Sequence, residues 1–107
     1  MRARERRALA SHLENLLLHL LKWRYQPAGR QTGHSWTDSI REARTQLAAG
    51  LTAAYAHSPH FHHRLVRCHR AARREASRQT GLPLAAFPEA CPWTLGQLLD
   101  DMFFPEP

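Results

Sequence analysis

The chain has 107 residues, which allows one domain with a modest core and leaves no room for a second. Hydrophobic residues make up 43% and charged residues 22% of it, a globular rather than a disordered composition. The formal net charge is +6, and eight histidines can add to it below neutral pH. Such a basic chain suits nucleic acid, acidic proteins or anionic lipid, and charge alone does not choose among them.

The first predicted helix spans residues 2–25 and ends before Pro27 and Gly29. Its apolar positions form one main stripe and a second arc beside it, which together are too wide for a single neighbour. We therefore expect a central helix that is contacted from two directions. The main stripe consists of Leu9, Leu13, Leu16, Leu17, Leu20 and Trp23, and the second arc consists of Leu18, Leu21 and Tyr25.

The second predicted helix spans residues 36–56 and precedes a break at His57, Ser58 and Pro59. Gly50 within it costs up to about 1 kcal/mol relative to Ala, so we expect a neighbouring helix to approach closely there. The apolar face of this helix consists of Trp36, Ile40, Ala43, Leu47, Leu51 and Ala54.

The third predicted helix spans residues 59–80. Ser58 is suited to cap its start, Pro59 tolerates the first helical position, and Gly81 is suited to end it. The small residues near the end of its inner face predict close approach to a neighbour. That inner face consists of Phe61, Leu65, Cys68, Ala72 and Ala76.

The C-terminal segment is rich in proline and aromatic residues, and Thr94 with Gln97 forms a capping box for a short helix over 95–102. We expect this segment to form a lid over an open end of the bundle. The predicted fold is therefore all-α, a three-helix antiparallel bundle with a short C-terminal helix or lid, in one domain over 1–107. The expected lid residues are Phe87, Trp93, Leu95, Leu98, Leu99 and Phe103.

Five histidines crowd into thirteen residues around the start of the third helix. Histidine-rich tracts can bind metal, but structural zinc sites have regular spacing and usually use thiolates. Only His60 and His63 are spaced to share an ion on one helix face. We therefore interpret the tract as a solvated helix start and predict no metal site and no cofactor. The tract consists of His57, His60, His62, His63 and His69.

Four arginines form a stripe on the third helix, opposite its inner face, and His63 extends it. A one-sided basic stripe is typical of nucleic-acid binding, so phosphate contact is one hypothesis. The simpler interpretation is that the outer face of any helix is polar. No aromatic residue interleaves with the stripe, and no known nucleic-acid motif is present. The arginine stripe consists of Arg67, Arg70, Arg74 and Arg78.

A small polar group is also possible if the first two helices pair antiparallel. It would consist of His19, Lys22 and Glu42. Such a group can anchor a ligand, but it more often closes a buried hydrogen-bond network, and we favour the network.

No hydrolase, metalloprotease, phosphate-loop or dinucleotide motif is present, so the sequence favours a protein that is not an enzyme. Cys91 has no sequence-local base that would make it a nucleophile. Cys68 and Cys91 are too few for a disulfide framework and predict reduced thiols in the cytoplasm. No apolar run is long enough for a membrane span, and no small-molecule ligand is inferred.

Five segments carry a family resemblance: LLLHLLKWRYQP (16–27), SWTDSIRE (35–42), HSPHF (57–61), TGLPLAAFP (80–88) and CPWTLGQLLDDMFFPE (91–106). Together they resemble the bacterial family called domain of unknown function twenty-nine. The resemblance covers nearly the whole chain, and it implies an all-α fold and no activity.

Members of that family look longer, with an acidic, aromatic N-terminal segment before the first helix. The resemblance therefore implies that the second arc, Leu18, Leu21 and Tyr25, is bare in this chain. A bare apolar patch marks an interaction surface. The leading hypothesis is a helical interaction module that self-associates or binds an acidic helical partner through this arc. The alternative is a nucleic-acid-binding accessory protein that uses the arginine stripe.

Overall fold

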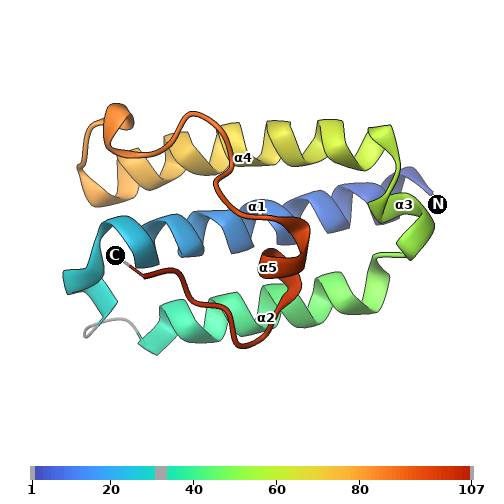
Figure 1. Ribbon diagram of the computed structural model, residues 1–107, viewed down its shortest axis with the longest axis horizontal. Helices are drawn as coiled ribbons and strands as arrows, with labels where there is room; N and C mark the ends of the chain where they lie inside the picture. Colours follow the sequence, from blue (N-terminus) through green and yellow to red (C-terminus); the bar gives the residue numbers. More distant parts are fainter. Residues whose placement is uncertain (1, 31–33, 107) are drawn as a thin grey trace.

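The computed structural model describes residues 2–30 and 34–106, and all regular structure in these ranges is helical (Figure 1). The predicted all-α fold is confirmed. The α-helices are α1 (Ala3–Tyr25), α2 (His34–Gly50), α3 (Ala53–Ala56), α4 (Pro59–Thr80) and α5 (Leu95–Leu99), and the 3₁₀ helices are η1 (Pro27–Arg30) and η2 (Leu84–Ala86).

Helix α1 is the centre of the molecule. It packs against α2 on one side and α4 on the other, while α2 and α4 barely touch each other. Figure 1 shows α1 and α4 running in one direction and α2 in the opposite one, so consecutive long helices are antiparallel. Leu16, Leu17 and Leu20 are fully buried. The predicted central helix with two neighbours is confirmed.

The ends of α4 follow from local chemistry, and the predicted range 59–80 is confirmed. The Ser58 hydroxyl accepts a hydrogen bond of 3.2 Å from the Phe61 N–H, which satisfies one of the free donors of the first turn. At the other end Gly81 has φ 75°, a left-handed conformation that glycine adopts without a Cβ clash.

The predicted single helix over 36–56 is wrong. Helix α2 begins at His34 and ends at Gly50, and the short helix α3 follows after Thr52. The Thr52 hydroxyl accepts a hydrogen bond of 3.2 Å from the Tyr55 N–H, so a side-chain cap replaces the continuous helix. The predicted close approach at Gly50 is confirmed, because a Cβ there would lie 3.0 Å from Leu9 Cδ2.

The C-terminal segment lies along the bundle rather than over one end of it, so the predicted end lid is wrong in its placement. In Figure 1 the segment turns back after α4, crosses α1, forms α5 beside α2 and ends near the C-terminal end of α1. Phe87 and Leu98 from this segment are buried in the core. The segment therefore packs along the bundle and contributes side chains to its core.

Helix α5 is shorter than the predicted 95–102 because the backbone is extended at Asp100, whose carboxylate accepts a hydrogen bond of 2.9 Å from the Met102 N–H. The predicted capping box is confirmed. The Gln97 N–H donates to the Thr94 hydroxyl at 3.1 Å, and the Gln97 side-chain oxygen accepts from the Thr94 N–H at 2.9 Å.

A buried arginine on α2 fastens the end of this segment. Arg44 is 2% exposed, and its guanidinium donates to the carbonyl oxygens of Leu98 (2.8 Å), Gln97 (3.3 Å) and Phe103 (2.8 Å). The last carbonyls of a helix have no partner within it and carry partial negative charge. Arg44 thus satisfies acceptors at the end of α5 from a helix about fifty residues earlier in the chain.

Candidate functional site

The second arc of α1, which was predicted to be bare, is covered. Leu21 is 0% and Leu18 is 8% exposed, and both belong to one core cluster with residues of α4 and the C-terminal segment. The half-buried Tyr25 ring meets Phe87 edge to face at 5.6 Å. The prediction of exposure is wrong because the arc packs into the core of this chain, and Phe87 of the C-terminal segment contacts Tyr25. The arc is therefore not a free docking surface.

The predicted polar group does not assemble. Glu42 is exposed on α2 and accepts a hydrogen bond from the Gln46 side chain at 2.9 Å. Lys22 is 8% exposed and turns to α4 instead, where its ammonium donates to the Gln79 side-chain oxygen at 2.7 Å. His19 donates from Nδ1 to the Asn15 carbonyl of its own helix at 2.8 Å. The prediction that these three side chains converge is therefore wrong, because Lys22 donates its hydrogen bond to a residue of α4.

Lys22 closes a buried contact between α1 and α4. Its ammonium also lies 5.2 Å from the centre of the Trp36 ring, a cation–π contact that partly replaces lost hydration. Burial lowers the pKa of Lys22, and the Glu75 carboxylate opposes that change. Lys22 therefore joins α1 to α4 and α2 without the predicted partners His19 and Glu42.

All four residues of the arginine stripe are exposed on α4. Arg78 forms a two-pronged ion pair with Glu75, with Nε 2.7 and 2.9 Å from the two carboxylate oxygens. Within residues 2–30 and 34–106, no carboxylate lies within ion-pair distance of Arg67, Arg70 or Arg74. Three guanidinium groups therefore face solvent without an ion pair to any described carboxylate, along about 10 Å of helix from Arg67 to Arg74.

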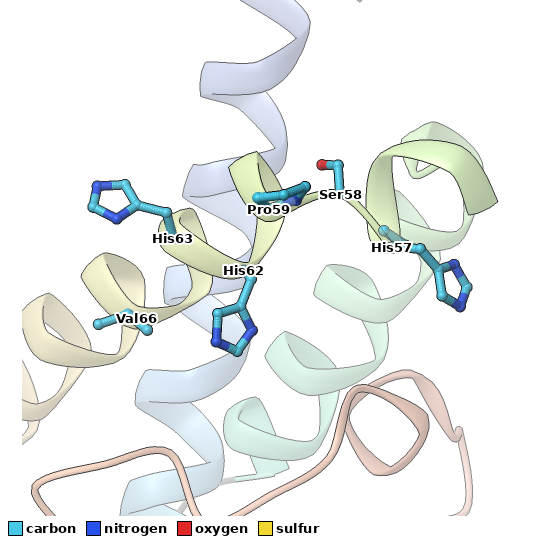
Figure 2. Close-up of a pocket in the computed structure, with 7 residues that line it drawn as sticks. His57, Ser58, Pro59, His62, His63 and Val66 are labelled. Carbon is cyan, nitrogen blue, oxygen red and sulfur yellow. The ribbon is translucent and has the colours of Figure 1, made fainter.

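The histidine tract surrounds a shallow hollow of about 450 Å³ at the start of α4. Figure 2 shows the imidazoles of His57, His62 and His63 pointing in different directions. Among the residues that the structure describes, no three His, Cys, Asp or Glu side chains are placed to hold one metal ion. These three exposed imidazoles diverge, but the prediction that the whole tract is solvated is wrong for His69.

His69 differs from the rest of the tract because it is only 2% exposed. It lines a second hollow, of about 340 Å³, between α4 and residues 89–93. In the described part of the chain, no group forms a hydrogen bond with its Nε2 atom. Buried polar atoms are normally paired, so this atom needs an explanation. The walls of the His69 pocket include apolar Leu65, Val66 and Trp93 and polar Arg70, Glu89 and Cys91.

The electrostatics of the His69 pocket favour the neutral forms of His69 and Cys91. Burial lowers the pKa of His69, and the nearby positive charge of Arg73 lowers it further. Burial raises the pKa of the Cys91 thiol, and its S–H donates to the Trp93 carbonyl oxygen, which lies 3.5 Å from the sulfur. A thiol with a raised pKa is a poor nucleophile at neutral pH, so the pocket lacks an activated cysteine.

The buried His69 predicts that stability falls with acidification. Its folded-state pKa lies below the ordinary value of 6.5, so the unfolded chain binds the proton more tightly. The neutral ring therefore contributes stability above about pH 6.5, and this is lost as pH falls through the folded-state pKa. His19, whose pKa is also lowered chiefly by burial, acts in the same direction. Urea unfolding at pH 7.5 and pH 5 measures the loss.

A substitution tests whether His69 causes this pH dependence of stability. His69→Gln should flatten the pH dependence, whereas the matched change His60→Gln, at an exposed position of the same helix, should leave it unchanged. Equal pH dependence in the His69→Gln variant and the original chain would contradict it.

Comparison with known proteins places the chain. A family model described as Domain of unknown function DUF29 matches residues 1–104. The chain belongs to this family. No curated protein and no solved structure matches it. Membership in DUF29 carries no activity with it, so the function has to be inferred from the surfaces and pockets described above.

The DUF29 chain has two buried polar residues that the sequence analysis missed, Arg44 and His69. Arg44 lies one helical turn from Ile40 and next to Ala43, on the edge of the inner face of α2, but nothing local distinguishes it from a surface arginine. His69 had a clearer signal. It lies four residues after Leu65 and three before Ala72, both on the inner face, so its spacing separates it from the exposed histidines.

None of the helices in the described part of this DUF29 chain combines the length and the apolar character that crossing a membrane requires. Both cysteines are free. The features that remain for function are the arginine stripe and the His69 pocket, which share Arg70.

Proposed function

We propose that this DUF29 chain is a non-enzymatic interaction module that binds an acidic segment of a partner protein through the arginine stripe of α4. The observation that carries the proposal is that, among the described residues, no carboxylate forms an ion pair with the exposed Arg67, Arg70 or Arg74. Charge of opposite sign on a partner would complement the stripe, guide the encounter and fix the register. The apolar arc on α1 plays no part, because it is buried.

Two further observations favour a protein partner over nucleic acid. Val66, between the stripe and the His69 pocket, is 46% exposed, so apolar surface lies beside the charges. Arginine next to exposed apolar side chains is typical of protein interfaces. Within α4 itself, no Phe, Tyr or Trp lies among the four arginines to stack on a base. Nucleic-acid binding by the same stripe is the alternative.

The proposal predicts that replacing Arg67, Arg70, Arg74 and Arg78 by Gln weakens binding of a glutamate-rich helical peptide about tenfold. Four exposed ion pairs at roughly 0.2–1 kcal/mol each account for such a loss. Fluorescence anisotropy with a labelled peptide measures it.

The matched control removes the same charge elsewhere. Replacing the exposed arginines 2, 4, 7 and 41 by Gln also takes four positive charges from a chain of net charge +6, and it should weaken binding much less. Equal weakening by both sets would mean that net charge alone attracts the peptide, and the proposed stripe would be wrong.

A duplex DNA probe distinguishes nucleic-acid binding by the stripe from binding of an acidic protein segment. If the duplex displaces the peptide at equal concentration, and its affinity falls steeply with salt, the stripe binds phosphate. That result would replace the protein partner with nucleic acid.

A further inference from the structure

The His69 pocket adjoins the arginine stripe. Arg70 belongs to both, since it lines the pocket and lies on the exposed side of α4. At 100° per residue, Arg70 lies only about 40° around the helix from Val66, another lining residue. Arg74 and Arg78 follow it at about 6 and 12 Å along the axis. A segment that lies on the stripe therefore passes the mouth of the pocket.

The size and lining of the pocket suit one aromatic side chain. A cavity of roughly 150 Å³ can hold a benzene ring, and this pocket of about 340 Å³ is larger. Leu65, Val66 and Trp93 supply apolar and aromatic walls for such a ring. An aromatic anchor in a pocket beside complementary charges is the usual source of most of the binding energy at an interface.

The polar groups of the pocket indicate which aromatic side chain fits. The His69 side chain lines the pocket, and its Nε2 atom is buried and has no partner among the described residues. Glu89, which also lines the pocket, would repel a carboxylate. A neutral hydroxyl avoids that repulsion and can hydrogen-bond with either tautomer of the imidazole. Among side chains, tyrosine combines an aromatic ring with such a hydroxyl.

We infer that the His69 pocket receives a tyrosine side chain of the acidic partner segment, with the tyrosine hydroxyl hydrogen-bonded to His69 Nε2. This inference rests on the proposed function and adds the anchor to it. A small molecule in the pocket would touch only Arg70 of the stripe, whereas a peptide with glutamates four and eight residues from its tyrosine also meets Arg74 and Arg78.

The test compares two synthetic helical peptides that carry glutamates at this spacing and differ only in a central tyrosine or phenylalanine. The tyrosine peptide should bind about fivefold more tightly, the effect of one hydrogen bond of about 1 kcal/mol. Ala90→Trp, at an exposed position that lines the pocket, should fill it and weaken the tyrosine peptide about tenfold. Calorimetric titration measures both differences.

The control variant is Ala85→Trp, which adds the same side chain at an exposed alanine of η2 away from the pocket lining. It should bind both peptides as the original chain does. In His69→Phe, the preference for tyrosine over phenylalanine should disappear. Circular dichroism checks that each variant is folded.

The failures are distinguishable. If Ala90→Trp binds the tyrosine peptide unchanged while the fourfold arginine variant does not, the pocket is not the anchor site and the proposed function stands. Equal affinity for the tyrosine and phenylalanine peptides overturns the hydrogen bond to His69. If neither peptide binds the original chain, the proposed function fails and this inference with it.

Discussion

Replacing Arg44 by methionine should lower the free energy of unfolding by about 3–5 kcal/mol, because several carbonyl oxygens lose a charged hydrogen-bond donor. The substitution keeps most of the aliphatic stem but removes the donors to three carbonyl oxygens of the C-terminal segment. Each buried carbonyl left without a donor costs roughly 1–3 kcal/mol. Urea unfolding followed by circular dichroism measures the change.

Two companion variants separate charge from geometry. Arg44→Lys keeps the positive charge but replaces the planar fork with a single ammonium, so it should still cost about 2 kcal/mol. Arg41→Met, at an exposed position of the same helix, should change stability by less than about 0.5 kcal/mol. If Arg44→Met were as mild as Arg41→Met, the guanidinium would not be what fastens the segment.

The helices that could be predicted are those whose ends are determined by capping residues nearby in the sequence. Helix α4 begins at Pro59 after the Ser58 cap and ends before Gly81, and each of these acts within one helical turn. The central position of α1 was predictable for a similar reason, because two apolar arcs on one helix require two neighbours. The periodicity of apolar residues indicates which helix faces are buried, and the leucines of both arcs of α1 are buried in the structure.

The path of the C-terminal segment could not be predicted because long-range contacts determine it. The three Arg44 hydrogen bonds join residues 53 to 59 positions apart in the chain. Trp23 meets Phe104 at a ring-centre distance of 5.1 Å across a still longer separation. No periodic pattern encodes such pairs. The end of α2 was missed for a local reason, since the capping role of Thr52 was overlooked.

The same distinction holds for the candidate site. The exposed stripe on α4 was predictable, because one helix carries all four arginines opposite its core face. The His69 pocket was not, because its other wall is formed by residues 89–93, which reach α4 only through the fold of the C-terminal segment. The prediction that Leu18 and Leu21 are bare failed because both side chains are buried in the core of this chain.

Phe87→Ala should therefore destabilise the protein by about 3–5 kcal/mol, the usual cost of removing a buried phenylalanine. Phe87 is 2% exposed, meets the Tyr25 ring edge to face, and is joined to α4 by a hydrogen bond of 3.1 Å from Arg73 Nε to its carbonyl. Losing the ring opens a cavity where the C-terminal segment covers the end of α1. At roughly 4–8 °C per kcal/mol for a domain of this size, Tm should fall by more than about 10 °C.

Two control variants test whether the loss of stability comes from the buried Phe87 ring. Phe87→Leu keeps much of the apolar volume and should cost far less, about 1.5 kcal/mol or below. Met102→Ala, at a side chain that is 86% exposed in the same segment, should have almost no effect. An apolar dye should bind the Phe87→Ala variant if the C-terminal segment covers the α1 arc, because loosening the segment exposes that arc to solvent. A Phe87→Ala variant as stable as Met102→Ala would mean that the segment only rests on the bundle, and the arc around Tyr25 would again be available to a partner.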